Sequence, residues 1–140
     1  MPILVRDVNG GLGVSILGWG EVTEKEYVDA FTKHLTQDSH KLIKYRYCIA
    51  DWMTVTKVEI PTVAIKLIAR LSKNAATVNP DVIIATVADQ DIMYGLSRMA
   101  QTLRDDAEWE NEVFRNRQEA EAWITARVKQ KYGIENPTFD

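Results

Sequence analysis

The sequence predicts a small α/β domain built on one mostly parallel sheet of about five strands, with an antiparallel hairpin at its N-terminal edge. Short apolar runs rich in β-branched residues alternate with longer segments of helical spacing, which is typical of parallel strands joined by helices. Only the first two runs are joined by a tight turn signal, Asn9-Gly10-Gly11. A length of 140 residues suits a single domain, residues 1–140, with one core.

The predicted order of elements is β-β-α-β-α-β-α-β-α. In sequence, we expect strands over 3–8 and 12–18, a helix over 24–35, a strand over 44–50, a helix over 61–74, a strand over 82–88, a helix from about 89 to 103, a strand over 112–115 and a helix over 117–132. The run over 82–88 (VIIATVA) is apolar at almost every position, which indicates a central strand buried on both faces.

Capping signals place the ends of several helices. Thr23 and Glu26 form a capping box, in which each side chain accepts a hydrogen bond from a backbone N–H at the helix start. Pro61 suits the first turn of a helix, where its missing N–H costs nothing. Asn116 resembles a second cap, and Gly133 is suited to end the last helix. We expect the tail from about residue 134 onward to be loose.

The composition excludes several classes of protein. The net charge of −3 does not favour binding to nucleic acid or to an anionic membrane. No apolar run approaches the roughly 18 residues that a membrane span needs. Cys48 is the only cysteine, so no intrachain disulfide can form, and its apolar surroundings predict a buried thiol. These features, with an N-terminus that lacks a secretory signal pattern, favour a cytoplasmic protein.

Three stretches resemble the STAS superfamily, and most closely its SpoIIAA-like branch of small bacterial proteins, which shares a fold with Sec14-like lipid-binding domains. They are Gly18–Tyr27 (GWGEVTEKEY), Asp51–Ile60 (DWMTVTKVEI) and Val113–Ile124, with its VFR and EAEAWI segments. The resemblance covers nearly the whole chain. It implies a regulatory or binding module without enzymatic activity and without a cofactor.

In the anti-sigma-factor antagonists of this superfamily, a serine at the start of the helix after strand three is phosphorylated. Phosphate there meets unpaired backbone N–H groups and a favourable helix dipole, yet it adds negative charge to a docking face. The corresponding acidic residue here is Glu59, and the serine position holds Ile60, which cannot accept phosphate. The resemblance therefore implies binding without this switch, with Thr54, Thr56 and Thr62 as the remaining hydroxyl candidates.

The binding surface is predicted from residues that follow the ends of strands. Trp19, Trp52 and Tyr94 each follow a predicted strand, and parallel strands bring such points to one edge of a sheet. The predicted surface, for a protein partner or a small apolar ligand, comprises Trp19, Asp51, Trp52, Thr54, Thr56, Glu59, Thr62 and Tyr94. Core packing of the aromatic residues is the alternative interpretation, and a homodimer is left open.

Two other functions are weighed. A Sec14-like carrier of an apolar ligand or lipid requires a deep apolar cavity between helices and sheet. An enzyme using Asp51, Glu59 or Asp91 requires carboxyl groups that converge in a cleft. A phosphate-accepting receiver domain is excluded because no acidic pair follows the first strand. A metal site is not predicted, since His34 and His40 have no partner at ligand spacing. For Asp51 we expect hydrogen bonds to its own turn.

Overall fold

The computed structural model describes residues 2–103 and 109–140, apart from the side chains of Ile92 and Leu103. Its elements are β1 (Ile3–Val8), η1 (Asn9–Gly11), β2 (Gly13–Thr23), α1 (Glu24–Leu35), α2 (Ser39–Leu42), β3 (Tyr47–Glu59), α3 (Thr62–Val78), β4 (Ile83–Val87), α4 (Asp91–Leu103), β5 (Glu110–Phe114) and α5 (Arg117–Tyr132). The strands form one sheet in the order β1-β2-β3-β4-β5. β1 is antiparallel to β2, and the other neighbours are parallel, so the predicted fold class is confirmed.

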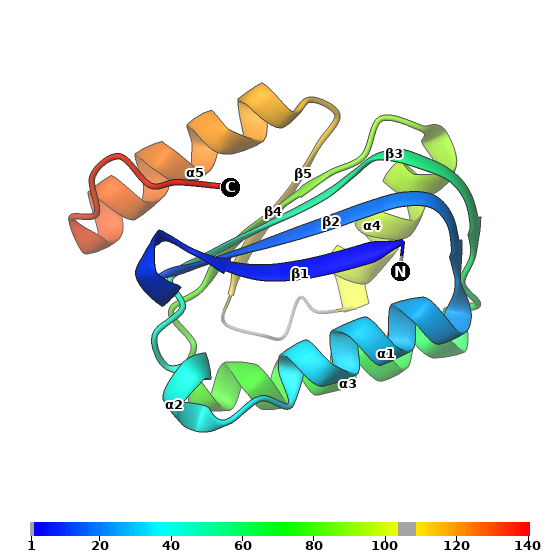
Figure 1. The fold of residues 1–140 in the computed structure, drawn as a ribbon, viewed down its shortest axis with the longest axis horizontal. Helices are drawn as coiled ribbons and strands as arrows, with labels where there is room; N and C mark the ends of the chain where they lie inside the picture. Colours follow the sequence, from blue (N-terminus) through cyan, green and yellow to red (C-terminus); the bar gives the residue numbers. More distant parts are fainter. Residues whose placement is uncertain (1, 104–108) are drawn as a thin grey trace.

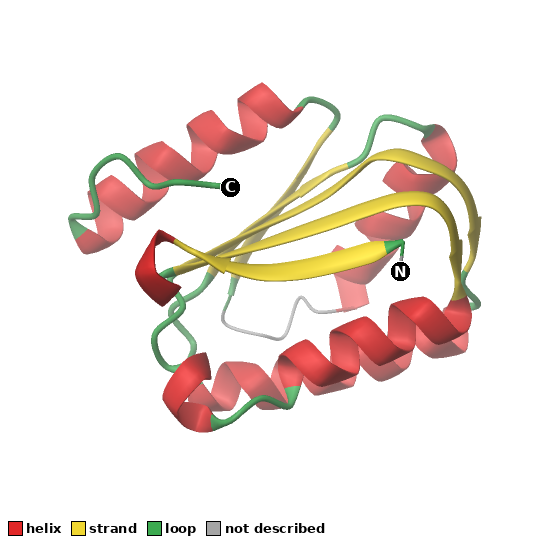
Figure 2. Cartoon of the chain, viewed as in Figure 1, coloured by secondary structure: helices red, strands yellow, loops and turns green. Residues whose placement is uncertain are grey.

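The helices form two layers on opposite faces of the sheet (Figures 1 and 2). α1 and α3 lie side by side under one face together with α4, and α5 lies on the other face. β3 shows why both faces are buried, because its side chains alternate between the layers. Cys48 and Ala50 face α1 and α3, whereas Tyr47 and Ile49 face α5.

The predicted caps are present at the starts of α1 and α5. Glu26 N donates to Thr23 Oγ1 at 3.3 Å, and Thr23 N donates to Glu26 Oε1 at 3.1 Å. Glu119 N donates to the side chain of Asn116 at 3.1 Å. Gly133 ends α5 in the left-handed conformation, with φ of 68°, as a C-terminal glycine is suited to do.

The predicted end of the third strand at residue 50 is wrong, because β3 continues through Asp51 to Glu59. It pairs with β2 as far as Thr23↔Glu59, with two irregularities in register. Its pairing with β4 ends earlier, at Asp51↔Val87, so β2 and β3 continue alone as a two-stranded ribbon that bends toward the start of α1 (Figure 1). Alternating Val and Thr residues suit such a strand. Pro61 precedes α3 as its N-cap and does not lie in its first turn.

The tail also differs from the expectation of a loose segment. Phe139 is 9% exposed and lies 5.6 Å from the ring of Tyr47, measured between centroids. Tyr47 Oη donates to the carbonyl of Thr138 at 2.6 Å. The chain after α5 therefore folds back over the sheet, as the red segment in Figure 1 shows, and completes the core on the α5 face.

Candidate functional site

A cavity of about 100 Å³ lies between the sheet and the helices α1, α3 and α4. Small side chains on facing elements leave this space. On the sheet side, the small residues of β3 that line it are Cys48 and Ala50. On the helix side, α3 presents Ala69 and Ser72. Since larger residues at these positions would fill the interior, the cavity follows directly from the choice of small residues.

Aromatic side chains form much of the cavity wall. Trp52 is 5% exposed and stacks with Phe31 of α1 at a centroid distance of 6.0 Å. Phe31 in turn lies 4.8 Å from Tyr27. Trp52 can lie flat against β2 because its neighbour there is Gly18, where a Cβ atom would overlap the indole ring. Trp109 adds a further wall, and its Nε1 donates to the carbonyl of Asn79 at 2.7 Å.

Among the described residues, the cavity lining contains no Asp, Glu, Lys or Arg side chain. The lining includes His34, whose ordinary pKa is near neutrality. Burial lowers the pKa of His34 to about 4, although the carboxylate of Asp7 opposes this shift. Gln37 Nε2 lies 3.1 Å from His34 Nδ1 and 2.8 Å from the His34 carbonyl. The imidazole is therefore neutral at physiological pH and accepts at Nδ1, which leaves the proton on Nε2.

Tyr45 closes the same end of the cavity. Its ring lies 5.8 Å from that of His34, and its hydroxyl donates to Asp7 Oδ1 at 2.8 Å. Burial, reinforced by the hydrogen bond to the Asp7 carboxylate, raises the pKa of Tyr45 to about 12. This hydroxyl is therefore a hydrogen-bond donor held in place, not a titrating group in the physiological range.

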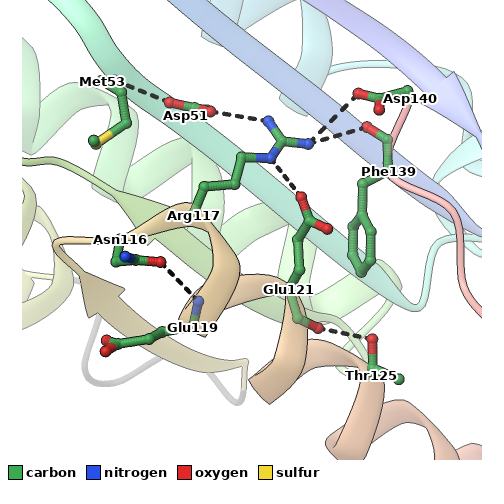
Figure 3. A network of polar contacts seen from close by, with 9 residues as sticks. All are labelled: Asp51, Met53, Asn116, Arg117, Glu119, Glu121, Thr125, Phe139 and Asp140. Atoms are coloured by element: carbon green, nitrogen blue, oxygen red, sulfur yellow. Dashed lines mark hydrogen bonds and ion pairs between the residues drawn. The ribbon is translucent and has the colours of Figure 1, made fainter.

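Asp51 belongs to a different site, on the α5 face of the sheet (Figure 3). Its Oδ1 accepts from Met53 N at 2.9 Å, which confirms the predicted bond to its own backbone although that backbone is a strand. Its Oδ2 pairs with Arg117 Nη1 at 2.9 Å. Arg117 also contacts Glu121 at 2.7 Å and the carbonyl of Phe139 at 3.5 Å. The cluster ties β3, the start of α5 and the tail together.

The residues of the predicted surface do not converge on one patch. Trp52 lines the cavity. Trp19 follows Gly18 on β2 and so points to the opposite face of the sheet, where it is 40% exposed. Tyr94 belongs to α4, and the guanidinium of Arg115 lies 4.0 Å from the centroid of its ring. The remaining hydroxyl candidates, Thr54, Thr56 and Thr62, are exposed, and Glu59 pairs with Lys57 at the surface.

The carboxyl groups proposed for an enzyme are also separate. Asp51 pairs with Arg117, Glu59 with Lys57, and Asp91 with Arg115 at 3.1 Å. None of the three lines the cavity between the sheet and the helices. Within residues 2–103 and 109–140, no cluster of three His, Cys, Asp or Glu side chains is arranged to hold a metal ion.

Sequence reasoning missed most of the cavity, although a signal was present. The inward positions of the third strand are occupied by Cys48 and Ala50, and the helix that crosses over it carries small residues on its buried stripe. Small residues on both sides of one interface indicate incomplete filling. The acidic residues around Trp109 in the sequence favour an exposed side chain, yet Trp109 is 9% exposed. Residues 105–108 of that stretch lie outside the described residues.

A scan against protein-family models, a search of curated proteins and a search of solved structures each returned no match. The resemblance to the STAS superfamily therefore stays a prediction. In the part of the chain that the structure describes, no helix has the length and apolar character required to cross a membrane. The function proposed below consequently depends on the geometry of this chain alone.

Proposed function

We propose that this protein is a binding module that holds a small apolar molecule in the cavity between the sheet and the helices α1, α3 and α4. The observation that carries the proposal is the cavity itself, about 100 Å³ in volume and lined mainly by apolar and aromatic side chains. Binding sites for small molecules are typically concave and apolar with a few polar groups. An apolar cavity of about 150 Å³ is known to accept benzene. The space here is smaller, so a compact molecule with no more non-hydrogen atoms than benzene suits it.

This proposal corresponds to the carrier function weighed from the sequence, but for a small ligand. A long lipid chain does not fit a volume of about 100 Å³. The cavity also lowers the stability of the fold. At about 24 cal/mol per Å³, leaving about 100 Å³ unfilled by side chains costs on the order of 2 kcal/mol relative to a fully packed interior. A ligand that fills the space offsets this cost, which favours binding.

The single cysteine supplies the test, since Cys48 lines the cavity. Cyclopentanol and methylcyclopentane are the probes. We expect both probes to slow the modification of Cys48 by methyl methanethiosulfonate, which is monitored by mass spectrometry of the intact protein. Ala50→Ile places three additional carbon atoms in the cavity and should abolish the protection by either probe. If neither probe slows the modification of Cys48 in the wild type, the proposed function is wrong.

Two variants control for indirect effects. Ala122→Ile makes the same enlargement at an exposed position on α5 and should leave the protection of Cys48 unchanged. Ala69→Val narrows the cavity from α3 and serves if Ala50→Ile does not fold. Protection that survives both cavity variants would mean that the probes act elsewhere.

A docking role for the opposite face is a second candidate, favoured by a specific observation. Leu4, Leu17 and Trp19 are 42%, 37% and 40% exposed and lie together on β1 and β2, on the face that carries α5. Their exposure is consistent with a protein partner, as the resemblance to the STAS superfamily implies. Sedimentation equilibrium over a range of concentrations tests the simplest partner, a second copy of the chain; a monomer throughout would remove that option.

A further inference from the structure

Two hydroxyl groups in the cavity are left without hydrogen-bond partners. Thr86 of β4 and Ser97 of α4 are each 8% exposed, and both line the cavity. Neither hydroxyl has a partner among the described residues. Ser72, on the opposite wall, shows the usual arrangement, because its Oγ donates to the carbonyl of Ile68 at 2.9 Å. Neither oxygen is among the completely buried atoms that lack a partner, so each keeps some accessible surface, and two unpaired hydroxyls that line one cavity are candidates to bind a ligand.

Their positions direct both groups into the same space. Thr86 pairs in register with Ala50 of β3, so its side chain stands beside the smallest part of the sheet wall. Ser97 enters from the helix side, on the same stripe of α4 as Met93, which also lines the cavity. A serine in a helix commonly donates to the carbonyl four residues earlier. Among the described residues no such bond is present for Ser97, so its hydroxyl, which lines the cavity, is a candidate to bind a ligand.

The charge of the lining restricts the ligand further. With no acidic, lysine or arginine side chain among the described residues of the wall and a neutral His34, none of these residues would balance a ligand charge. A charged group transferred from water into such a space loses its hydration without compensation. An uncharged oxygen loses much less, and it recovers its hydrogen bonds from the two hydroxyls.

We propose that the cavity selects an uncharged small apolar molecule that carries one hydroxyl or carbonyl oxygen, and that Thr86 and Ser97 bind this oxygen. The inference rests on the proposed function and names the class of ligand. A carbonyl oxygen accepts from both hydroxyls, and a ligand hydroxyl donates to one and accepts from the other. The apolar part of the molecule occupies the space between Ala50, Ala69 and the aromatic wall.

The experiment compares four probes that share a five-carbon ring: cyclopentanol, cyclopentanone, methylcyclopentane and cyclopentanecarboxylate. Dissociation constants are obtained from the fluorescence of Trp52 and Trp109, which line the cavity, and from protection of Cys48. The test variant is Thr86→Val with Ser97→Ala, which removes both hydroxyls and keeps the cavity open. The control is Thr56→Val, which removes an exposed strand hydroxyl outside the cavity.

In the wild type, we expect cyclopentanol and cyclopentanone to bind and the carboxylate not to bind. The preference for cyclopentanol over methylcyclopentane should fall about tenfold in the double variant, as expected for the loss of hydrogen bonds to the ligand oxygen. The Thr56→Val variant should retain the wild-type preference. Cyclopentanol and cyclopentanone separate the two kinds of oxygen, because only the alcohol can also donate.

The possible results distinguish this inference from the proposed function. An unchanged preference in the double variant, with methylcyclopentane still protecting Cys48, would overturn the inference and leave the proposed function standing. Carboxylate binding as tight as that of cyclopentanol would overturn the selection against charge. If none of the four probes binds, both proposals fail. Ser97→Ala alone, for which we expect a smaller loss of preference, replaces the double variant if that protein does not fold.

Discussion

The pair between Arg117 and Asp51 gives a quantitative test of the role of Asp51. In Arg117→Met, the Asp51 carboxylate stays buried, with the 2.9 Å bond from Met53 N as its remaining contact. The Arg117 and Asp51 side chains are 25% and 9% exposed. Breaking a fully buried pair costs about 3–5 kcal/mol, and exposed pairs contribute at most about 1 kcal/mol. Because Arg117 is partly exposed, we expect a loss of about 2–3 kcal/mol.

The assay is urea unfolding of a double-mutant cycle. Asp51→Asn keeps an acceptor for Met53 N but removes the charge, so adding it to Arg117→Met should recover part of the loss, with a coupling of roughly 1–2 kcal/mol. Lys25→Met is the control, because it breaks the Lys25–Asp29 pair, in which both partners are exposed. A change for Arg117→Met no larger than that of the control would refute the structural role of Asp51 and return it to the candidates for chemistry.

Two further predictions concern the walls of the cavity. Burial lowers the pKa of His34 from 6.5 to about 4, so between these pH values the unfolded chain takes up a proton that the folded chain does not. As the pH is lowered from about 7 to about 4, the free energy of unfolding should therefore decrease by up to about 3 kcal/mol. Urea unfolding at several pH values should show this fall as the difference between the wild type and His34→Asn, and parallel profiles would contradict it. Gly18→Ala forces a Cβ atom into the ring of Trp52, so we expect a loss of about 1–3 kcal/mol. Gly95→Ala on α4, where a Cβ meets open space, should instead be neutral or stabilising by about 0.5–1 kcal/mol in thermal unfolding, and equal effects of the two substitutions would contradict the packing argument.

The features that were predicted correctly depend on residues close together in the sequence. The Thr23–Glu26 capping box spans one turn of helix, and Gly133 ends α5 through its own backbone conformation. The run from Val82 to Ala88 is buried throughout, as its composition indicates. Alternation of such elements determines the order of the fold, because each one forms for local reasons and the connections are short.

The features that were missed depend on contacts across the sequence. β3 extends to Glu59 because β2 lies beside it, and the alternation of Val and Thr residues after Asp51 was a local strand signal that only this pairing made decisive. Asp51 finds its partner Arg117 at a separation of 66 residues. No local pattern connects these positions. The sequence therefore indicated Asp51 as a functional residue, whereas in the structure it belongs to the cluster around Arg117 that ties β3, α5 and the tail together.

The sequence by itself therefore determined the class of this protein: an α/β domain with a hairpin edge, capped helices and a buried single cysteine. Only the tertiary structure decided where a ligand could bind. Trp19 and Trp52 looked equivalent at neighbouring strand ends, but β-strand alternation places them on opposite faces of the sheet. The cavity beside Trp52 exists because small residues of β3 face small residues of α3, and packing between distant segments is what leaves that space unfilled.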